Sequence, residues 1–282
     1  MIKIILLAVS VIFSSRLLAN AGLIDYPDVD PAPSYTSLLE LDYSQSTKTI
    51  DYGSDPQQFV QFYKAKKAEE SQTMVIFVHG GCWLSEYDIQ HSSAFATALS
   101  QKGMDVWNIE YRRAGNGGEW PVALNDIKAA INMFTTEFNK EGKYKKVFLL
   151  GHSAGGHLAM RVASELNLPN LHLIGLAPIV DVQAYAFGDN SCQTATKAFM
   201  QGMPNDIPEA YDNATLVNKS LSHLPSAYIF HGGEDKIVPI AQTIHPDTGF
   251  MQIPYAAHFD WIFPGTPGNN RLLQYMEKIV NE

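Results

Sequence analysis

The amino-acid sequence predicts an α/β fold with a mostly parallel, eight-stranded sheet and helices on both of its faces. Two patterns carry this prediction. Short runs such as residues 74–78 and 146–150 are continuously apolar instead of alternating, as expected for strands covered on both faces. These runs alternate along the chain with helix-like stretches, which is typical of parallel βαβ units. With 282 residues, of which 46% are hydrophobic, the chain is long enough to bury a sizeable core.

The expected elements follow one another in a regular order. Strands are expected at residues 47–52, 59–63, 74–78, 106–111, 146–150, 171–176, 227–230 and 250–253. Helices are expected at residues 92–101, 122–138, 156–165 and 270–280. The helix at 122–138 keeps its apolar side chains near one face, so it is expected to pack on the sheet.

Two further segments show little periodicity. Residues 22–46 are polar and contain prolines, and we expect an N-terminal arm that wraps around the rest of the chain. Residues 181–223 are expected to form a small cap-like insertion between strands six and seven, with short helices near 195–201 and 208–216. No linker composition divides the chain, so residues 22–282 are predicted to form a single domain.

Composition argues against several classes of partner and cofactor. The chain has 29 acidic and 20 basic residues, so it has no positive surplus for nucleic acid or an anionic membrane. Two cysteines are too few for a disulfide scaffold or a cysteine-built zinc site. Neither a dinucleotide-binding G-x-G-x-x-G nor a metal-binding H-E-x-x-H motif is present. We therefore expect no metal and no cofactor.

The first 21 residues have the pattern of a secretory signal peptide. Lys3 precedes an uncharged apolar run over residues 4–15, and the segment ends in Leu18-Ala19-Asn20-Ala21. That run is shorter than the roughly 20 residues of a membrane span. We expect cleavage after Ala21 and an exported protein, periplasmic or secreted, without a stable membrane anchor; an uncleaved anchor is the alternative.

The motif Gly151-His152-Ser153-Ala154-Gly155 lies directly between an expected buried strand and an expected helix. In that context G-x-S-x-G predicts a tight turn that lifts a nucleophilic serine above the sheet, where only small neighbours fit. Ser153 is the candidate nucleophile. The adjacent His152 and the later His157 are expected to pack rather than to act as bases.

A second motif, His79-Gly80-Gly81-Cys82-Trp83, follows the expected strand 74–78. Two consecutive glycines allow backbone N–H groups to face an acyl oxygen without interfering side chains. We expect the N–H groups of Gly80, Gly81 and Ala154 to form an oxyanion hole, with His79 orienting the loop. Cys82 and Trp83 are expected to line the substrate pocket, with simple burial as the alternative for Trp83.

The expected chain order of a triad on such a sheet is serine, acid, histidine. Asp235 follows the seventh expected strand, and Glu234 and Asp181 are its rivals. His258 is the only histidine after the last expected strand. We expect His258 to remove the proton of Ser153 and Asp235 to orient the imidazole.

Together these motifs resemble α/β-hydrolases of the hormone-sensitive-lipase-like, kynurenine formamidase (arylformamidase)-like branch. The resemblance extends from about residue 47 to the C-terminus and also includes Glu110-Tyr111-Arg112-Arg113, Trp120-Pro121 and His258-Phe259-Asp260. It implies a serine hydrolase that acts on small carboxylic esters or aryl formamides. Two departures concern the substrate: export is unexpected for tryptophan catabolism inside a cell, and Cys82 occupies a position that is often tyrosine.

Several alternatives stay open at this stage. Cys82 and Cys192 form either a disulfide that clips the insertion to the oxyanion loop or two separate buried thiols. Arg112 either anchors loops or binds a substrate carboxylate. A peptidase or aminoacyl amidase, and a non-catalytic binding protein on the same fold, are the competing functions. The partner expected in each enzymatic case is a small-molecule ester or amide.

Overall fold

A computed structural model describes residues 22–66 and 70–282 of the chain. One eight-stranded sheet has the order β1-β2-β4-β3-β5-β6-β7-β8. The strand pairs β1–β2 and β2–β4 are antiparallel and all other neighbouring pairs are parallel. The strands are β1 Lys48–Asp51, β2 Phe59–Tyr63, β3 Thr73–Val78, β4 Asp105–Ile109, β5 Lys146–His152, β6 Leu171–Leu176, β7 Ser226–Gly232 and β8 Gly249–Ile253.

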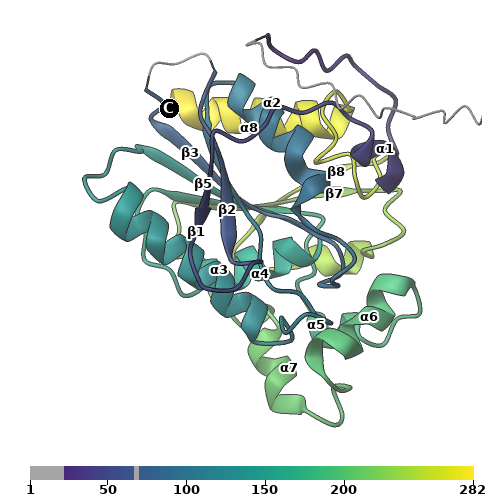
Figure 1. The fold of residues 1–282 in the computed structure, drawn as a ribbon. Coiled ribbons are helices and arrows are strands. Elements are labelled where there is room, and N and C mark those ends of the chain that lie inside the picture. Colours follow the sequence, from purple (N-terminus) through teal and green to yellow (C-terminus); the bar gives the residue numbers. More distant parts are fainter. Residues whose placement is uncertain (1–21, 67–69) are drawn as a thin grey trace, which may run out of the picture.

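Helices cover both faces of this sheet. The α-helices are α1 Tyr35–Leu39, α2 Ser93–Gln101, α3 Val122–Met133, α4 Ala154–Ala163, α5 Val182–Tyr185, α6 Ser191–Met200, α7 Pro208–Ala214 and α8 Pro267–Asn281. Helices α2 and α8 lie on one face and α3 and α4 on the other, while α5, α6 and α7 gather beyond one end of the sheet (Figure 1). Each face has its own cluster of buried apolar side chains. The predicted α/β fold with helices on both faces is confirmed.

The boundaries of several elements differ from the sequence-based expectation for local reasons. The expected strand 106–111 ends at Ile109, because the N–H of Tyr111 donates to the carboxylate of Glu110 at 2.7 Å and not to a neighbouring strand. The expected helix 122–138 is α-helical to Met133 and continues as a π-helical turn, Phe134–Phe138. Helix α8 begins three residues early, because Thr266 caps it and proline is favoured in the first turn.

The N-terminal arm runs along α2 and α8 toward the loops at the end of the sheet (Figure 1). The N–H of Val29 donates to the carbonyl of Gly265 at 3.1 Å. The N–H of Ala32 donates to the carboxylate of Asp260 at 2.9 Å. Polar contacts therefore attach the arm to the segment that follows β8.

The expected signal peptide, residues 1–21, lies outside the described residues. In the part of the chain that is described, no helix is both long and apolar enough to cross a membrane.

Candidate active site

Ser153 occupies a strained turn between β5 and α4. Its backbone has φ 56° and ψ −122°, a region that a non-glycine residue enters at a cost of about 1–3 kcal/mol. A side chain on Gly151 would collide with the carbonyl of Gly155, and one on Gly155 would collide with the carbonyl of His79. The glycines of the G-x-S-x-G motif are therefore required by close backbone approach, and the packed turn holds the serine in place.

Asp235 and His258 lie together after β7 and β8. The Nδ1–H of His258 donates to Oδ2 of Asp235 at 2.7 Å. The other carboxylate oxygen accepts from the N–H groups of Ile237 at 2.8 Å and Val238 at 2.9 Å. Both oxygens of the buried carboxylate are thus satisfied, and the imidazole has a fixed orientation.

Opposing effects act on the pKa of Asp235. Burial alone raises it, but the neighbouring His258 and the N–H of Val238 lower it by more, so the pKa lies below its ordinary value. The carboxylate is therefore ionised at neutral pH, as a group that stabilises an imidazolium must be.

The two rival carboxylates are engaged differently. Asp181 caps α5, with Oδ1 accepting from the N–H of Ala184 at 2.9 Å. Glu234 is exposed to solvent. Asp235 is the one of the three that bonds to His258.

His152 connects the serine turn to the histidine loop. Its Nε2 lies 3.0 Å from the carbonyl oxygen of His258, and the two rings are 4.6 Å apart. Burial holds the pKa of His152 well below its usual range. His152 is therefore a neutral donor that packs against the loop of His258, in agreement with the expected packing role.

The hydroxyl of Ser153 makes no hydrogen bond to His258 within residues 22–66 and 70–282. Ser153 is only 2% exposed and His258 only 4%. Such contacts are often long in unliganded enzymes and shorten when substrate binds.

The loop after β3 turns through three consecutive residues with positive φ: Gly81 at 111°, Cys82 at 52° and Trp83 at 59°. Gly80 lies against the serine turn, because a Cβ at this position would lie 2.9 Å from the carbonyl of His152 and 3.1 Å from Cβ of Ser153. In the described part of the chain, neither Gly80 nor Gly81 donates a backbone hydrogen bond. The predicted oxyanion loop thus lies beside Ser153 with free N–H groups.

Ala154 is the third residue predicted to contribute an N–H group to the oxyanion hole. It is the first residue of α4, where backbone N–H groups lack partners within the helix. The positive end of the helix dipole favours negative charge at this position.

The insertion is attached to the same loop. A disulfide joins Cys82 to Cys192 of α6, with Cα atoms 5.1 Å apart. The ring of Trp83 stacks on Phe199, also on α6, with centroids 4.7 Å apart. Trp83 is completely buried, so it packs the insertion onto the loop and presents no surface to a substrate in this structure.

The arginines near the site are both paired. Arg112 donates through Nε and Nη2 to the carboxylate of Asp126, at 2.9 and 2.7 Å. Arg113 donates to the carboxylate of Glu110. Arg112 thus anchors the loop after β4, which is the first of the two roles considered for it.

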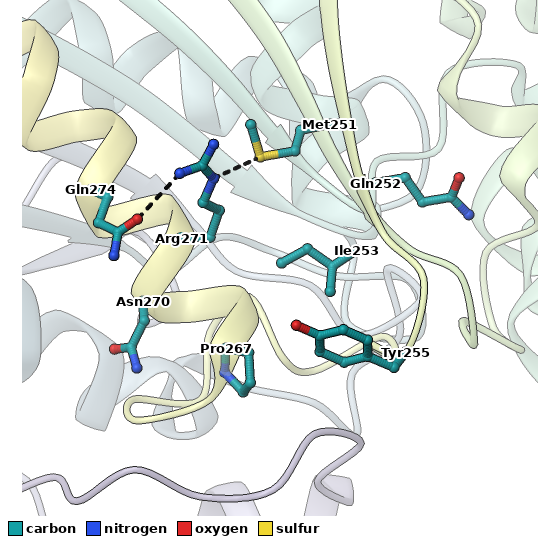
Figure 2. A pocket seen from close by; sticks show the side chains of 8 residues that line it. All are labelled: Met251, Gln252, Ile253, Tyr255, Pro267, Asn270, Arg271 and Gln274. Carbon is teal, nitrogen blue, oxygen red and sulfur yellow. Dashed lines mark hydrogen bonds between the residues drawn. The ribbon is translucent and has the colours of Figure 1, made fainter.

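A groove of about 400 Å³ lies elsewhere, between β8 and α8. Arg271 points into it, with Nε 3.4 Å from the sulfur of Met251 and Nη1 3.3 Å from Oε1 of Gln274 (Figure 2). None of the predicted site residues lines this groove. Over the described ranges, no group of three or more His, Cys, Asp or Glu side chains is arranged to hold a metal ion.

Known proteins share this sequence pattern and fold. A family model for BD-FAE matches residues 60–246, which include the predicted oxyanion loop, Ser153 and Asp235. The chain belongs to the BD-FAE family. The esterase LipC of Mycobacterium tuberculosis is 22% identical over 83% of this chain and 65% of its own length. A kynurenine formamidase of Meyerozyma guilliermondii is 27% identical over 45% of this chain and 46% of its own. The chain spans about half to two thirds of the length of these curated relatives.

Solved structures support the fold of this BD-FAE member. A truncated carbohydrate esterase from gut microbiota superposes with a TM-score of 0.69 at 19% identity, covering 85% of this chain and 98% of that chain. Esterase B of Lactobacillus rhamnosis superposes with a TM-score of 0.68 at 17% identity, covering 86% and 89%. The fold is that of the α/β-hydrolases, as the motifs predicted.

Two polar residues near the site have no role that follows from the sequence alone. Glu110 is buried and bonds to His79 at 3.0 Å. His231 is buried beside Asp235, with Nε2 3.7 Å from Oδ2. One signal was available for His231: His231-Gly232-Gly233 repeats the tripeptide His79-Gly80-Gly81 at the end of another buried strand.

Proposed function

We propose that this chain is a serine hydrolase that cleaves small carboxylic esters through an acyl-enzyme on Ser153. The observation that carries the proposal is the 2.7 Å hydrogen bond between Asp235 and His258, formed next to a serine in a strained strand-to-helix turn. The resemblance to proteins named esterases supports the same reaction class.

The proposed roles follow from the arrangement. His258 takes the proton of Ser153 as Oγ attacks the ester carbonyl, and Asp235 stabilises the resulting imidazolium. The N–H groups of Gly80, Gly81 and Ala154 bind the oxyanion of the tetrahedral intermediate. His258 then returns the proton to the departing alkoxide, which leaves as an alcohol. A water molecule then attacks the acyl carbonyl as His258 takes its proton. His258 passes this proton to Oγ of Ser153, and the acyl group leaves as a carboxylic acid.

The test compares wild type with Ser153→Ala on nitrophenyl esters of rising acyl length and on an aryl formamide. We expect wild type to hydrolyse the short esters and Ser153→Ala to lose at least about 10³-fold in kcat. The free energy of unfolding, measured in urea, should not fall, because alanine removes only the hydroxyl group and leaves the packing of the turn unchanged. Wild-type turnover by Ser153→Ala would refute the mechanism.

A formamidase is the second candidate, since a relative at 27% identity is a kynurenine formamidase. The formamide arm of the same panel decides between the two. If wild type cleaves neither class and a fluorophosphonate probe fails to label Ser153, the chain is a binding protein on a hydrolase fold.

We also propose that residues 1–21 are a signal peptide and that the mature, single-domain protein is exported. The disulfide between Cys82 and Cys192 supports this, because disulfides persist in oxidising compartments. N-terminal sequencing of the expressed protein should begin at Gly22, and a sequence that begins at Met1 would contradict the proposal.

A further inference from the structure

His79 is a buried residue directly after β3 that makes hydrogen bonds with both of its ring nitrogens. Nδ1 lies 2.8 Å from the carbonyl oxygen of Gly80, and Nε2 lies 3.0 Å from Oε1 of Glu110. The ring stacks on Tyr111 with centroids 4.6 Å apart, and the hydroxyl of Tyr111 donates to the carbonyl of His79 at 2.9 Å. The position of this imidazole is therefore fixed on every side.

The hydrogen bond to the carbonyl of Gly80 determines the direction in which the N–H of Gly81 points. A peptide group is planar and trans, so its C=O and N–H point in opposite directions. The carbonyl of Gly80 and the N–H of Gly81 belong to one peptide group. When Nδ1–H of His79 holds that carbonyl, the N–H of Gly81 is directed away from His79.

Both partners of the His79 ring are acceptors. Nδ1 faces the carbonyl of Gly80 and Nε2 faces the carboxylate of Glu110, so each ring nitrogen has its own partner. Burial alone raises the pKa of Glu110, but His79 and Arg113 lower it by more, so it lies below its ordinary value and the carboxylate is ionised.

Glu110 is itself held in place. Beyond His79, its oxygens accept from the N–H of Tyr111 at 2.7 Å, from the N–H of Ile89 at 3.0 Å and from the guanidinium of Arg113. A buried carboxylate with this many donors keeps one orientation, and its hydrogen bond to Nε2 therefore also fixes the orientation of the His79 ring.

We propose that Glu110 and His79 are positioning residues of the reaction: Glu110 orients the ring of His79, and His79 aims the N–H of Gly81 at the oxyanion. This inference rests on the serine hydrolase function proposed above. The carbonyl of Gly80, if released, could rotate and turn the N–H of Gly81 away from the developing charge.

Two amide substitutions separate the two ends of the imidazole. The amide nitrogen of asparagine takes the place of Nδ1, so His79→Asn keeps a donor for the carbonyl of Gly80. The amide nitrogen of glutamine takes the place of Nε2, so His79→Gln keeps the bond to Glu110 and loses the donor to Gly80. The two variants bury similar polar groups and differ in which bond survives.

We expect His79→Gln to lose about 10²-fold in kcat on a short nitrophenyl ester, the effect of removing one oxyanion donor, with KM unchanged. His79→Asn should retain about tenfold more kcat than His79→Gln, because one oriented donor remains. Equal kcat for the two variants would overturn the proposal, as would a loss expressed only in KM.

Glu110→Gln is the second variant, and Asp126→Asn is its matched control. Asp126 is an equally buried carboxylate that bonds to Arg112 and Gln58 and does not touch the oxyanion loop. Both substitutions should lower the free energy of unfolding, but only Glu110→Gln should lower kcat per folded molecule. An equal loss of kcat in both variants would show a merely structural role.

The two comparisons also remain independent of each other. If His79→Gln does not fold, Glu110→Gln against Asp126→Asn decides the same question. If wild type hydrolyses no ester and no formamide, the proposed function fails; if wild type is active and all four variants match it, only this inference fails.

Discussion

The hydrogen-bonded pair of Asp235 and His258 illustrates how other groups compensate a buried carboxylate for its lost hydration. A carboxylate removed from water loses hydration, which by itself favours its protonated form. At Asp235 two backbone N–H groups and the imidazole replace that hydration, so the charged form is the stable one. The acid of the proposed triad is therefore prepared before any substrate binds.

Replacement of this carboxylate tests its assignment. We expect Asp235→Asn to lower kcat by about 10²–10⁴-fold, because an amide neither stabilises the imidazolium nor holds the required tautomer of His258. The measurement is the initial rate on a short nitrophenyl ester near pH 8, with folding checked by circular dichroism.

The neighbouring Glu234 provides the control. It is exposed, so Glu234→Gln should keep wild-type kcat. A large loss of kcat in Glu234→Gln together with full activity in Asp235→Asn would show that Glu234, and not Asp235, is the acid.

How far the site follows from the sequence depends on how local its signals are. Ser153 is marked by small neighbours within two residues, and Asp235 and His258 by their place after buried strands. Glu110 has no such local signal, because its partners come from the loop after β3, from the residues before α2 and from the loop after β4. A single carboxylate at the end of a strand is compatible with many roles until the chain is folded.

At the scale of elements, two strands end in the same way. His231 at the end of β7 repeats the contact of His79, with Nδ1 2.8 Å from the carbonyl of the glycine that follows, Gly232. Its Nε2 lies 3.0 Å from the carbonyl of Val238, whose N–H holds Asp235. A buried histidine thus fixes each of two loops, the one with the proposed oxyanion donors and the one with the proposed acid.

The sequence predicted the long elements better than the short ones. Eight strands are expected and eight are present in residues 22–66 and 70–282, and most of them have an apolar run of their own. Helices α1 and α5 were not expected, because five and four residues are too few to show a helical period. Side chains that cap their first turns, Ser34 and Asp181, define these helices instead.

Helix α6 is attached to the oxyanion loop by the disulfide, which closes a sequence separation of 110 residues. Loss of this link should reduce the free energy of unfolding by up to about 4.7 kcal/mol, because the unfolded chain regains loop entropy. The measurement is urea unfolding with and without a thiol reductant, alongside thiol titration of the unfolded, unreduced protein, which should find no free thiol.

Cys192→Ser is the matched control for the reductant. It should resemble reduced wild type in stability and should not respond to reductant. Two free thiols in unreduced wild type would contradict the prediction.

Over the whole molecule, both faces of the sheet contain buried histidines that carry no charge. Burial lowers the pKa of His91 to about 3 and that of His157 to about 4, and it lowers the pKa of His152 strongly. In the unfolded chain each imidazole would titrate near its ordinary value of about 6.5. The folded protein therefore binds fewer protons than the unfolded chain in mildly acidic solution.

The sign of the effect on stability follows directly. Above about pH 6.5 these imidazoles are neutral in both the folded and the unfolded state, so they do not make the free energy of unfolding depend on pH. As the pH falls below that value, the imidazoles bind protons in the unfolded chain but not in the folded protein. The free energy of unfolding therefore falls until the pH reaches the pKa of the folded state. Each such histidine contributes a slope of about 1.4 kcal/mol per pH unit in that window.

His157→Gln isolates one of these contributions. Nε2 of His157 lies 3.0 Å from the carbonyl of Ala214, and the amide nitrogen of glutamine can occupy the same place without titrating. Between about pH 6.5 and 4, the free energy of unfolding of the variant should therefore decline less steeply than that of wild type, by about 1.4 kcal/mol per pH unit. The measurement is urea unfolding, extrapolated linearly to water, at pH steps from 8 to 4. Above pH 7 the two curves should run parallel, which serves as the internal control. Parallel curves over the whole range would mean that His157 titrates alike in both states, contrary to its burial.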